Sequence, residues 1–369
     1  MALKVIDVLR QFLPEFLKTK PSLSGAQWRA IRAITNCRTS AIGGHLYTCD
    51  KCGDRAFAYH SCNHNACPQC GRDATRKWVE RELGKRINAP YFMVTFTLPT
   101  ELRGLFFGVH AKEAYDLFFK ASAAALSEKL AMPKFLGAKV SGFTGVLHTW
   151  NQRLLFHPHI HFIVPGAGIN ARGDVVKVKK GDYLVHVQTL AKAFQHHFRQ
   201  GLEEKEWGVD PDVRCKEWRI NIKDFGAGNN VIKYLGRYVH RIAIGDRRIK
   251  AITDDSITFE WKDRKDGDKL KLKTVPGIEF VKRYLRLVTP QKMGRIRYFG
   301  FCHPAAKRKR EHIRFHTGIP LEIDPPKPAE EKEERALGIP TCPCCQKPMK
   351  KLGSFRRYCT PRAPPARMS

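Results

Sequence analysis

The sequence lacks any run of apolar residues long enough to cross a membrane. A spanning helix needs about 18 consecutive apolar residues, and no segment of the chain approaches this length. The start of the chain also lacks the apolar core of a signal peptide. We therefore expect a cytoplasmic protein that does not bind a membrane. The chain further contains no P-loop and shows no internal repeat.

Acidic residues are scarce relative to basic residues. The 369-residue chain has 66 Lys and Arg against 35 Asp and Glu, a formal net charge of +31. This excess is spread along the whole chain and repels itself unless a polyanion binds, so we expect a nucleic-acid partner. Binding to DNA would associate the protein with the nucleoid. A chain of this length is expected to fold into two or three domains.

Cysteine, by contrast, is plentiful. Ten of the 12 cysteines lie in two clusters near the ends of the chain, whereas Cys215 and Cys302 stand alone and are expected to be core thiols. Short spacings between cysteines in a reducing compartment favour metal binding over disulfides.

The first cysteine cluster contains two Cys-x-x-Cys pairs, Cys49 with Cys52 and Cys67 with Cys70. A pair of this kind lies on a tight turn, and two pairs provide four thiolates for tetrahedral zinc. The spacing therefore predicts one four-cysteine zinc ribbon or knuckle. Other ligand types nearby either close a second zinc site or pack around the first: Cys37, His45, Cys62 and either His60 or His64.

The second cluster, Cys342-Pro-Cys344-Cys345 with Cys359, lies near the other end of the chain. It follows a segment rich in Pro, Glu and Lys, which is typical of a linker. The cluster is a candidate for a small zinc knuckle of its own, although it lacks an obvious fourth ligand.

Between the two clusters the hydrophobic pattern predicts an α+β fold. A strand, a helix, two strands joined as a hairpin, a helix and a further strand follow one another, the order of a ferredoxin-like sandwich with an antiparallel sheet. Helical segments and the zinc module precede it. We expect residues 1–88 to be a helical and zinc-binding DNA-recognition domain, residues 89–320 the α+β domain with a β-rich extension, and residues 321–369 a linker with the C-terminal knuckle.

Three histidines share one face of the strand predicted over residues 154–164. Alternate side chains of a strand point the same way, so His157, His159 and His161 project together. The unit His159-Ile-His161 can direct two imidazoles at one metal ion. A His-x-His motif alone is more often formed by exposed or core histidines that bind nothing.

Two tyrosines lie four residues apart in the helix predicted over residues 229–242. Tyr234 and Tyr238 therefore share a helix face. Either ring alone is typical of a core aromatic residue. With Arg237 and Arg241 nearby, the pair fits two phenolic nucleophiles that face DNA.

Other basic side chains are candidates for contacts with DNA phosphates. Arg38 adjoins the first cysteine cluster, and Lys307 and Arg308 begin a basic run in a predicted helix. Basic residues on a metal-stabilised module or a helix typically contact the nucleic-acid backbone.

Taken in order, these motifs resemble the insertion-sequence ninety-one family of rolling-circle transposases. The resemblance covers about residues 25–305 and departs from the family pattern at Ala66, where members commonly have histidine. The motifs that carry it are Cys37-Arg-Thr, Gly43-Gly-His45, Cys49-x-x-Cys52, Tyr59-x-Ser-Cys62, Cys67-Pro-x-Cys70, Leu147-His-Thr-Trp150, His157-Pro-His-Ile-His161, Val164-Pro-Gly166, Tyr234-Leu-x-Arg-Tyr238 and Arg297-Tyr-x-Gly300.

The resemblance implies a zinc-binding domain followed by an endonuclease domain of the HUH type, named for its histidine–hydrophobic–histidine motif. In such a domain His159 and His161 would hold Mg²⁺ or Mn²⁺ at the scissile phosphate, and Tyr234 and Tyr238 would nick single-stranded transposon ends and target DNA. Attack by tyrosine leaves a 5'-phosphotyrosine and a free 3'-hydroxyl. Because HUH enzymes often add a polar ligand, Gln152 on the preceding strand is the preferred third metal ligand, with His157 and His148 as alternatives.

Two other functions remain open at this point. A plasmid relaxase or replication initiator shares the HUH chemistry, but it usually lacks the zinc module and often carries a helicase region. A non-catalytic, zinc-dependent DNA-binding regulator would use the histidines and tyrosines only as structural residues. Metal-dependent cleavage of a single strand separates an enzyme from a regulator.

Overall fold

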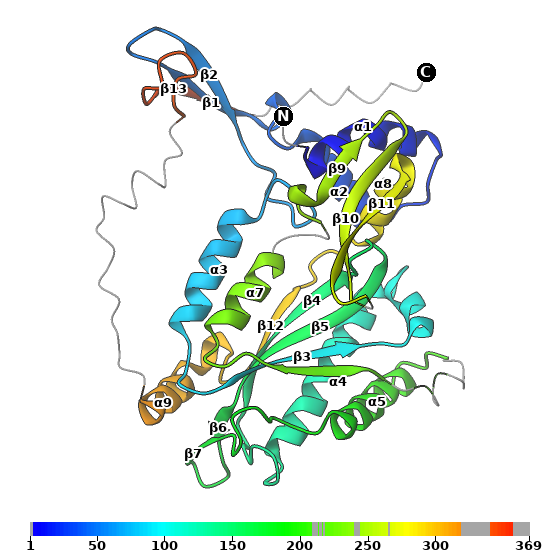
Figure 1. Cartoon of the computed structure of the whole chain (residues 1–369), viewed down its shortest axis with the longest axis vertical. Helices are drawn as coiled ribbons and strands as arrows, with labels where there is room; N and C mark the ends of the chain where they lie inside the picture. The colour runs from blue at the N-terminus through cyan, green and yellow to red at the C-terminus, as the bar shows by residue number, and fades with distance from the viewer. Residues whose placement is uncertain are drawn as a thin grey trace, which may run out of the picture.

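The computed structural model describes residues 3–208, 213, 216, 218–239, 244–264, 266–318 and 340–356. It is a mixed α+β structure with antiparallel strand pairing throughout the described sheets (Figure 1). Cys215, Arg241 and Cys359 lie outside the described residues.

A five-stranded sheet in the order β12-β4-β5-β3-β8 forms the centre of the molecule. The predicted hairpin is confirmed as β4 and β5, which pair along their length with His148 opposite His159. The strands rich in β-branched and aromatic residues thus occupy the interior of the sheet. The bounds are β3 (Tyr91–Thr97), β4 (Gly142–Trp150), β5 (Phe156–Pro165), β8 (Ile220–Asp224) and β12 (Ile296–Gly300).

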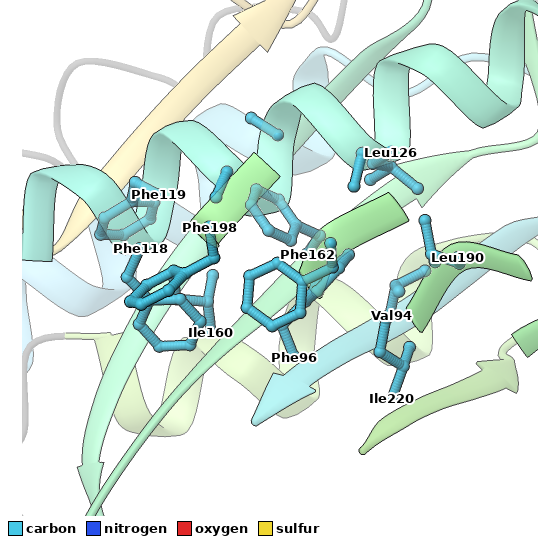
Figure 2. Close-up of a cluster of buried hydrophobic side chains, with 14 of the residues drawn as sticks. Val94, Phe96, Phe118, Phe119, Leu126, Ile160, Phe162, Leu190, Phe198 and Ile220 are labelled. Atoms are coloured by element: carbon cyan, nitrogen blue, oxygen red, sulfur yellow. The ribbon is translucent and has the colours of Figure 1, made fainter. Parts of the chain in front are cut away.

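Helices α4 (Ala111–Ala131) and α5 (Val187–Glu203) cover one face of this sheet. Alternate residues of β5, Ile160 and Phe162, point into this layer, where aromatic rings from the helices meet them (Figure 2). Each fully buried side chain of this size contributes about 1.5–3 kcal/mol. This core fixes which face of β5 is turned away from α4 and α5.

The opposite face of the sheet is covered by α3 (Arg72–Gly84), α7 (Asn229–Val239) and α9 (Lys307–Thr317). Helices α3 and α7 lie side by side (Figure 1). They approach closely at Gly236, where a Cβ atom would lie 2.3 Å from Cγ2 of Val79. A side chain at this position would therefore force the two helices apart.

A second core joins the two N-terminal helices to a distant part of the chain. Helices α1 (Val5–Lys18) and α2 (Gly25–Asn36) pack against α8 (Gly277–Arg286) and a sheet in the order β11-β10-β9. Ser24 begins α2 as an N-cap that accepts a hydrogen bond from the Gln27 backbone N–H. The strands are β9 (Ile249–Ile252), β10 (Ser256–Asp263) and β11 (Lys269–Pro276).

A third sheet, in the order β13-β1-β2, lies at one end of the molecule (Figure 1). Its strands are β1 (Gly44–Thr48), β2 (Arg55–Tyr59) and β13 (Lys350–Phe355), so one strand comes from near the C-terminus. We call this sheet with its turns the ribbon. The remaining short elements are β6 (Ala167–Ile169), β7 (Val175–Lys177), η1 (Ser40–Ile42), η2 (Thr100–Phe106), η3 (Asp246–Arg248) and η4 (Pro304–Ala306).

Candidate metal centres

Three histidines meet on the face of the central sheet that carries α7. On β5, Ile163 belongs to the core under α7, so His159 and His161 point to the same side. On β4, Val146 belongs to that core, which places His148 on this side as well. One ring nitrogen from each of the three histidines lies within 4.8 Å of the others.

Hydrogen bonds orient two of these rings. Nδ1 of His159 lies 2.8 Å from the backbone oxygen of His157. Because a carbonyl oxygen only accepts, Nδ1 carries the proton and donates, which leaves the lone pair of Nε2 free for a metal. Nδ1 of His161 lies 2.8 Å from the hydroxyl oxygen of Thr95. Such partners hold ligating imidazoles in position.

Burial keeps these histidines neutral near pH 7. It lowers the pKa of His159 to about 4 and holds the pKa of His148 and His161 well below the ordinary value. His148 is 5% exposed and His161 is 9% exposed. A neutral imidazole is the form that binds a metal, so the cluster fits a divalent cation.

The other candidates for the third ligand are not part of this group of three. His157 accepts a hydrogen bond from Nη2 of Arg103 at 2.8 Å, and burial lowers its pKa to about 3. Gln152 is not on the strand, because β4 ends at Trp150; it lies in the turn before β5, where its backbone carbonyl accepts a hydrogen bond from Arg248. The side chain that joins His159 and His161 is that of His148, one of the two predicted alternatives to Gln152, which pairs with His159 across the β4–β5 hairpin.

The tyrosine pair lies on α7, over the same face of the sheet as the histidines. Tyr234 is half-buried and packs against the core under α7, with its ring centroid 5.9 Å from that of Phe225. The side chains of Tyr238 and Arg237 lie outside the described part of the structure, although the helix itself continues through them. Their spacing along α7 places Tyr234 and Tyr238 on one side of it.

Four cysteines form a cluster at the end of α2. The sulfur atoms of Cys37, Cys62, Cys67 and Cys70 lie within 4.8 Å of one another, with Cys37 and Cys70 at 3.6 Å. Four sulfurs around tetrahedral zinc lie about 3.8 Å apart. The cluster is part of the second core, where the hydroxyl of Tyr284 donates to the carbonyl of Ala66 at 2.7 Å. These residues therefore fit a structural zinc ion.

A second cluster lies in the ribbon and draws on both ends of the chain. Cys49 lies 3.4 Å from Cys345, and Cys52 lies 3.4 Å from Cys342, measured between sulfur atoms. All four sulfurs lie within 4.8 Å of one another, which again fits tetrahedral zinc. Cys344 is exposed and outside this group.

The predicted grouping of the cysteines is therefore wrong. The two N-terminal Cys-x-x-Cys pairs belong to different clusters, because Cys49 and Cys52 lie in the turn that joins β1 to β2, whereas Cys67 and Cys70 follow β2. The missing signal was in the sequence: Cys342 and Cys345 are themselves spaced as a Cys-x-x-Cys pair.

His45 is also outside both clusters. Its Nδ1 lies 2.8 Å from the hydroxyl of Ser354 on β13, and its ring lies against that of His60, with 4.7 Å between centroids. His64 accepts a hydrogen bond from the backbone N–H of Ala66 at 3.1 Å. The first cluster consists of four cysteines, Cys37, Cys62, Cys67 and Cys70, and includes no histidine.

Three of the predicted phosphate contacts are exposed basic side chains. Arg38 directly follows Cys37 of the first cysteine cluster, and Lys307 and Arg308 begin α9.

Within the described residues, no helix is long and apolar enough to cross a lipid bilayer.

Comparisons with known proteins match two parts of the chain. A family described as "Putative transposase" matches residues 142–310, and one described as "Transposase zinc-binding domain" matches residues 8–98. The first match includes the histidine cluster and both tyrosines. The second includes the cysteines from Cys37 to Cys70 but ends far before Cys342.

Two curated relatives extend over most of the chain. "Putative transposase y4qJ" of Sinorhizobium fredii (strain NBRC 101917 / NGR234) is 34% identical over 370 residues, which cover 93% of this chain and 92% of the relative. "Transposase for insertion sequence element IS801" of Pseudomonas savastanoi pv. phaseolicola is 27% identical over 283 residues, 72% of this chain and 67% of the relative. No solved structure matches the chain.

Proposed function

The chain belongs to the insertion-sequence ninety-one family of transposases, and from this membership we propose that it cuts and joins single-stranded transposon-end DNA by tyrosine attack. The observation that carries the proposal is the position of the histidine cluster. His148, His159 and His161 lie on the face of the sheet that α7, the helix of Tyr234 and Tyr238, also covers. A metal-binding group and two nucleophiles thus share one layer of the fold.

The topology of the central sheet supports an HUH endonuclease domain. Strands β3, β4, β5 and β8 are adjacent in the order β4-β5-β3-β8, and α4 and α5 connect them on one face. This is the strand order and helix placement of a ferredoxin-like sandwich, with β12 added beside β4. The fold leaves the other face of the sheet for the histidines.

The three imidazoles of His148, His159 and His161 would hold a divalent cation, Mn²⁺ or Mg²⁺. Such an ion neutralises the non-bridging oxygens of a phosphodiester, which otherwise repel a nucleophile. The protein's own contribution is to keep the rings neutral by burial and to orient His159 and His161 by the hydrogen bonds to His157 and Thr95. Neither orientation requires the ion.

The tyrosines supply the covalent chemistry. The phenolic oxygen of one tyrosine bonds to phosphorus, the bond from phosphorus to the 3' oxygen breaks, and the 3' oxygen takes up a proton as the phenol loses one. The product is a 5'-phosphotyrosine with a free 3'-hydroxyl. With both Tyr234 and Tyr238 on α7, one can hold the donor end while the other attacks a second strand.

The test is formation of a covalent adduct with a labelled single strand on a denaturing gel. Wild-type protein with Mn²⁺ or Mg²⁺ should form the adduct, and the Tyr234→Phe and Tyr238→Phe variants should each abolish complete transposition in cells while at least one still permits single cleavage. The double variant should form no adduct. Phenylalanine preserves the packing of the ring, so a loss reports the hydroxyl. An adduct in the double variant would contradict the assignment of the nucleophiles.

Structural zinc in both cysteine clusters is part of the same proposal. In the proposed arrangement residues 1–88 recognise DNA, residues 89–320 carry out the chemistry, and the C-terminal part supplies Cys342 and Cys345 to the ribbon. The charge of +31 and the DNA substrate also support contacts with DNA phosphates by basic side chains, namely Arg38, Arg237, Arg241, Lys307 and Arg308. The protein would act at the nucleoid, in the cytoplasm.

The two rival functions are separated by observation and by experiment. Both curated relatives are named as transposases, which favours transposition over plasmid relaxation or replication initiation. A zinc-dependent regulator would bind the labelled strand without forming an adduct.

A further inference from the structure

The ribbon presents an exposed row of aromatic rings. Phe57 and Tyr59 on β2 are 57% and 38% exposed. Their rings are nearly parallel, at 6° with 6.1 Å between centroids. The ring of Phe355 on β13 meets both edge-on, at 5.9 Å from Phe57 and 6.1 Å from Tyr59. A contiguous exposed patch of large rings is a feature that marks interaction sites on proteins.

These rings are not needed for the interior of the ribbon. Alternate residues of β2, Ala56 and Ala58, face the other side, where they pack with Tyr47, Cys49 and Met349 around the cysteine cluster. Strand alternation therefore gives the ribbon one face that forms its own core and one face that carries the aromatic rings. We call the second face the aromatic face.

The backbone beneath the rings is shaped to let them meet. Gly44 on β1 lies opposite Tyr59 on one side and Phe355 on the other. A Cβ atom at Gly44 would lie 2.6 Å from the carbonyl oxygen of Ala58 and 3.1 Å from Cζ of Phe355. Only glycine leaves room for rings from the two outer strands to close over the central strand.

The charge around the rings is positive. None of the residues in β1, β2 and β13 is acidic. Arg55 lies on the same side of β2 as Phe57. Thr48 on β1 pairs with Arg55 on one side and with Lys350 on the other, so Lys350 also belongs to the aromatic face. Both basic side chains are exposed. Aromatic rings flanked by cations are the features with which proteins bind single-stranded nucleic acid.

We propose that the aromatic face binds single-stranded DNA, with bases stacked on Phe57, Tyr59 and Phe355 and phosphates held by Arg55 and Lys350. Unpaired bases fit this face better than a duplex, because the base faces of a duplex are already stacked on one another. The identity of the ligand rests on the proposed function, in which the substrate is a single strand. The C-terminal strand then contributes to DNA binding directly, through Phe355.

The test compares two labelled oligonucleotides of equal length, one of thymidines and one with the same phosphates but without bases. Fluorescence anisotropy on the full chain, without added Mg²⁺ or Mn²⁺, measures both affinities. Wild-type protein should prefer the oligonucleotide with bases. The Phe57→Ala/Tyr59→Ala variant should bind the oligonucleotide with bases more weakly than wild type, by about 5-fold or more for each ring removed. The reason is that stacking contributes about 1–3 kcal/mol per base. Its affinity for the abasic strand should not change.

Matched variants separate stacking from loss of structure. Tyr59→Phe keeps a ring and should bind as wild type. Tyr183→Ala removes an exposed ring outside the ribbon, 42% exposed, and should also bind as wild type. The zinc content of the Phe57→Ala/Tyr59→Ala protein should equal that of wild type.

Three results would overturn the proposal. In the first, the alanine variant binds both strands as wild type does. In the second, it loses affinity equally for the strand with bases and for the abasic strand. Alternatively, the wild-type chain could self-associate through this face, with the alanine variant monomeric and its DNA binding unchanged. The anisotropy experiment measures binding and not cleavage. If the gel experiment found no tyrosine adduct, it would therefore refute the proposed function but leave the binding result unchanged.

Discussion

Replacing both Cys342 and Cys345 by serine should lower the zinc content of the protein from two ions per chain to one. These residues supply half of the ligands in the ribbon, and two thiolates alone bind zinc far more weakly than four. The other cluster shares no ligand with the ribbon, so it should keep its ion. The same loss should follow replacement of Cys49 and Cys52.

The magnitude follows from the span that the ribbon closes. Cys52 and Cys342 are 290 positions apart, and joining residues at that separation in an unfolded chain costs up to about 5–6 kcal/mol of chain entropy. Zinc binding to four-ligand peptides contributes about 10–16 kcal/mol, which exceeds this cost. Backbone hydrogen bonds between β13 and β1 contribute only about 0.5–1.5 kcal/mol each. Without zinc, the pairing of β13 is therefore expected to be marginal.

The assay is elemental analysis of zinc in purified full-length protein, together with hydrogen exchange of the β1 and β13 amides. In the double variant β13 should lose most of its protection, whereas the amides of β4 and β5 should keep theirs. Cys344→Ser is the matched control, because Cys344 adjoins both ligands in sequence but is exposed and outside the cluster. It should retain two zinc ions and a protected β13.

The reasoning would be refuted if the double variant kept two zinc ions and the protection of β13. Loss of an ion from the Cys344→Ser protein would equally refute the assignment of ligands. Loss of both ions from the double variant would show that the two clusters are not independent.

Three further predictions concern the histidine cluster, the contact between α3 and α7, and DNA binding. Thr95→Val removes the hydrogen bond to Nδ1 of His161 and should raise the Mn²⁺ concentration needed for half-maximal cleavage by about 10- to 100-fold; an unchanged requirement would exclude this role. Gly236→Ala should destabilise the protein by about 1–3 kcal/mol in thermal unfolding and reduce adduct formation, because the new methyl group would clash with Val79. Adding Val79→Ala to this variant should restore both stability and adduct formation. If the smaller residue at position 79 gave no recovery, the close approach of α3 and α7 would not be the cause. The logarithm of the DNA association constant should fall against the logarithm of salt concentration with a slope of several units, about 0.7 per phosphate, and a flat response would contradict binding driven by the charge of +31.

The central sheet was predictable because its signals are local. The alternation along β5 places Ile160 and Phe162 in one core and His159 and His161 on the opposite face, and a period of two is visible in the sequence itself. The predicted hairpin follows from the short connection between two such strands. His148 was only an alternative to Gln152 as the third ligand, because it reaches the cluster through its pairing with His159 across the hairpin and not through a spacing along one strand.

The partition of the cysteines was not predictable from local spacing in the N-terminal segment. A Cys-x-x-Cys pair specifies a turn that presents two thiolates, but it carries no information about which other pair will face it. Here Cys49 and Cys52 face a pair from the opposite end of the chain, and Cys67 and Cys70 face Cys37 and Cys62. Tertiary structure alone makes that choice. A count of pairs, three in the whole sequence, would have shown that one pair was left without a partner.

The ribbon also sets an order of events during protein synthesis. Its first two cysteines emerge from the ribosome early, whereas Cys342 and Cys345 are translated after the whole central sheet. At about 5–20 residues per second, the 290 positions between Cys52 and Cys342 correspond to about 15–60 s. A chain interrupted before Cys342 would contain the histidines and both tyrosines but only half of the ribbon's zinc site. Completion of the ribbon therefore distinguishes a finished polypeptide from a truncated one.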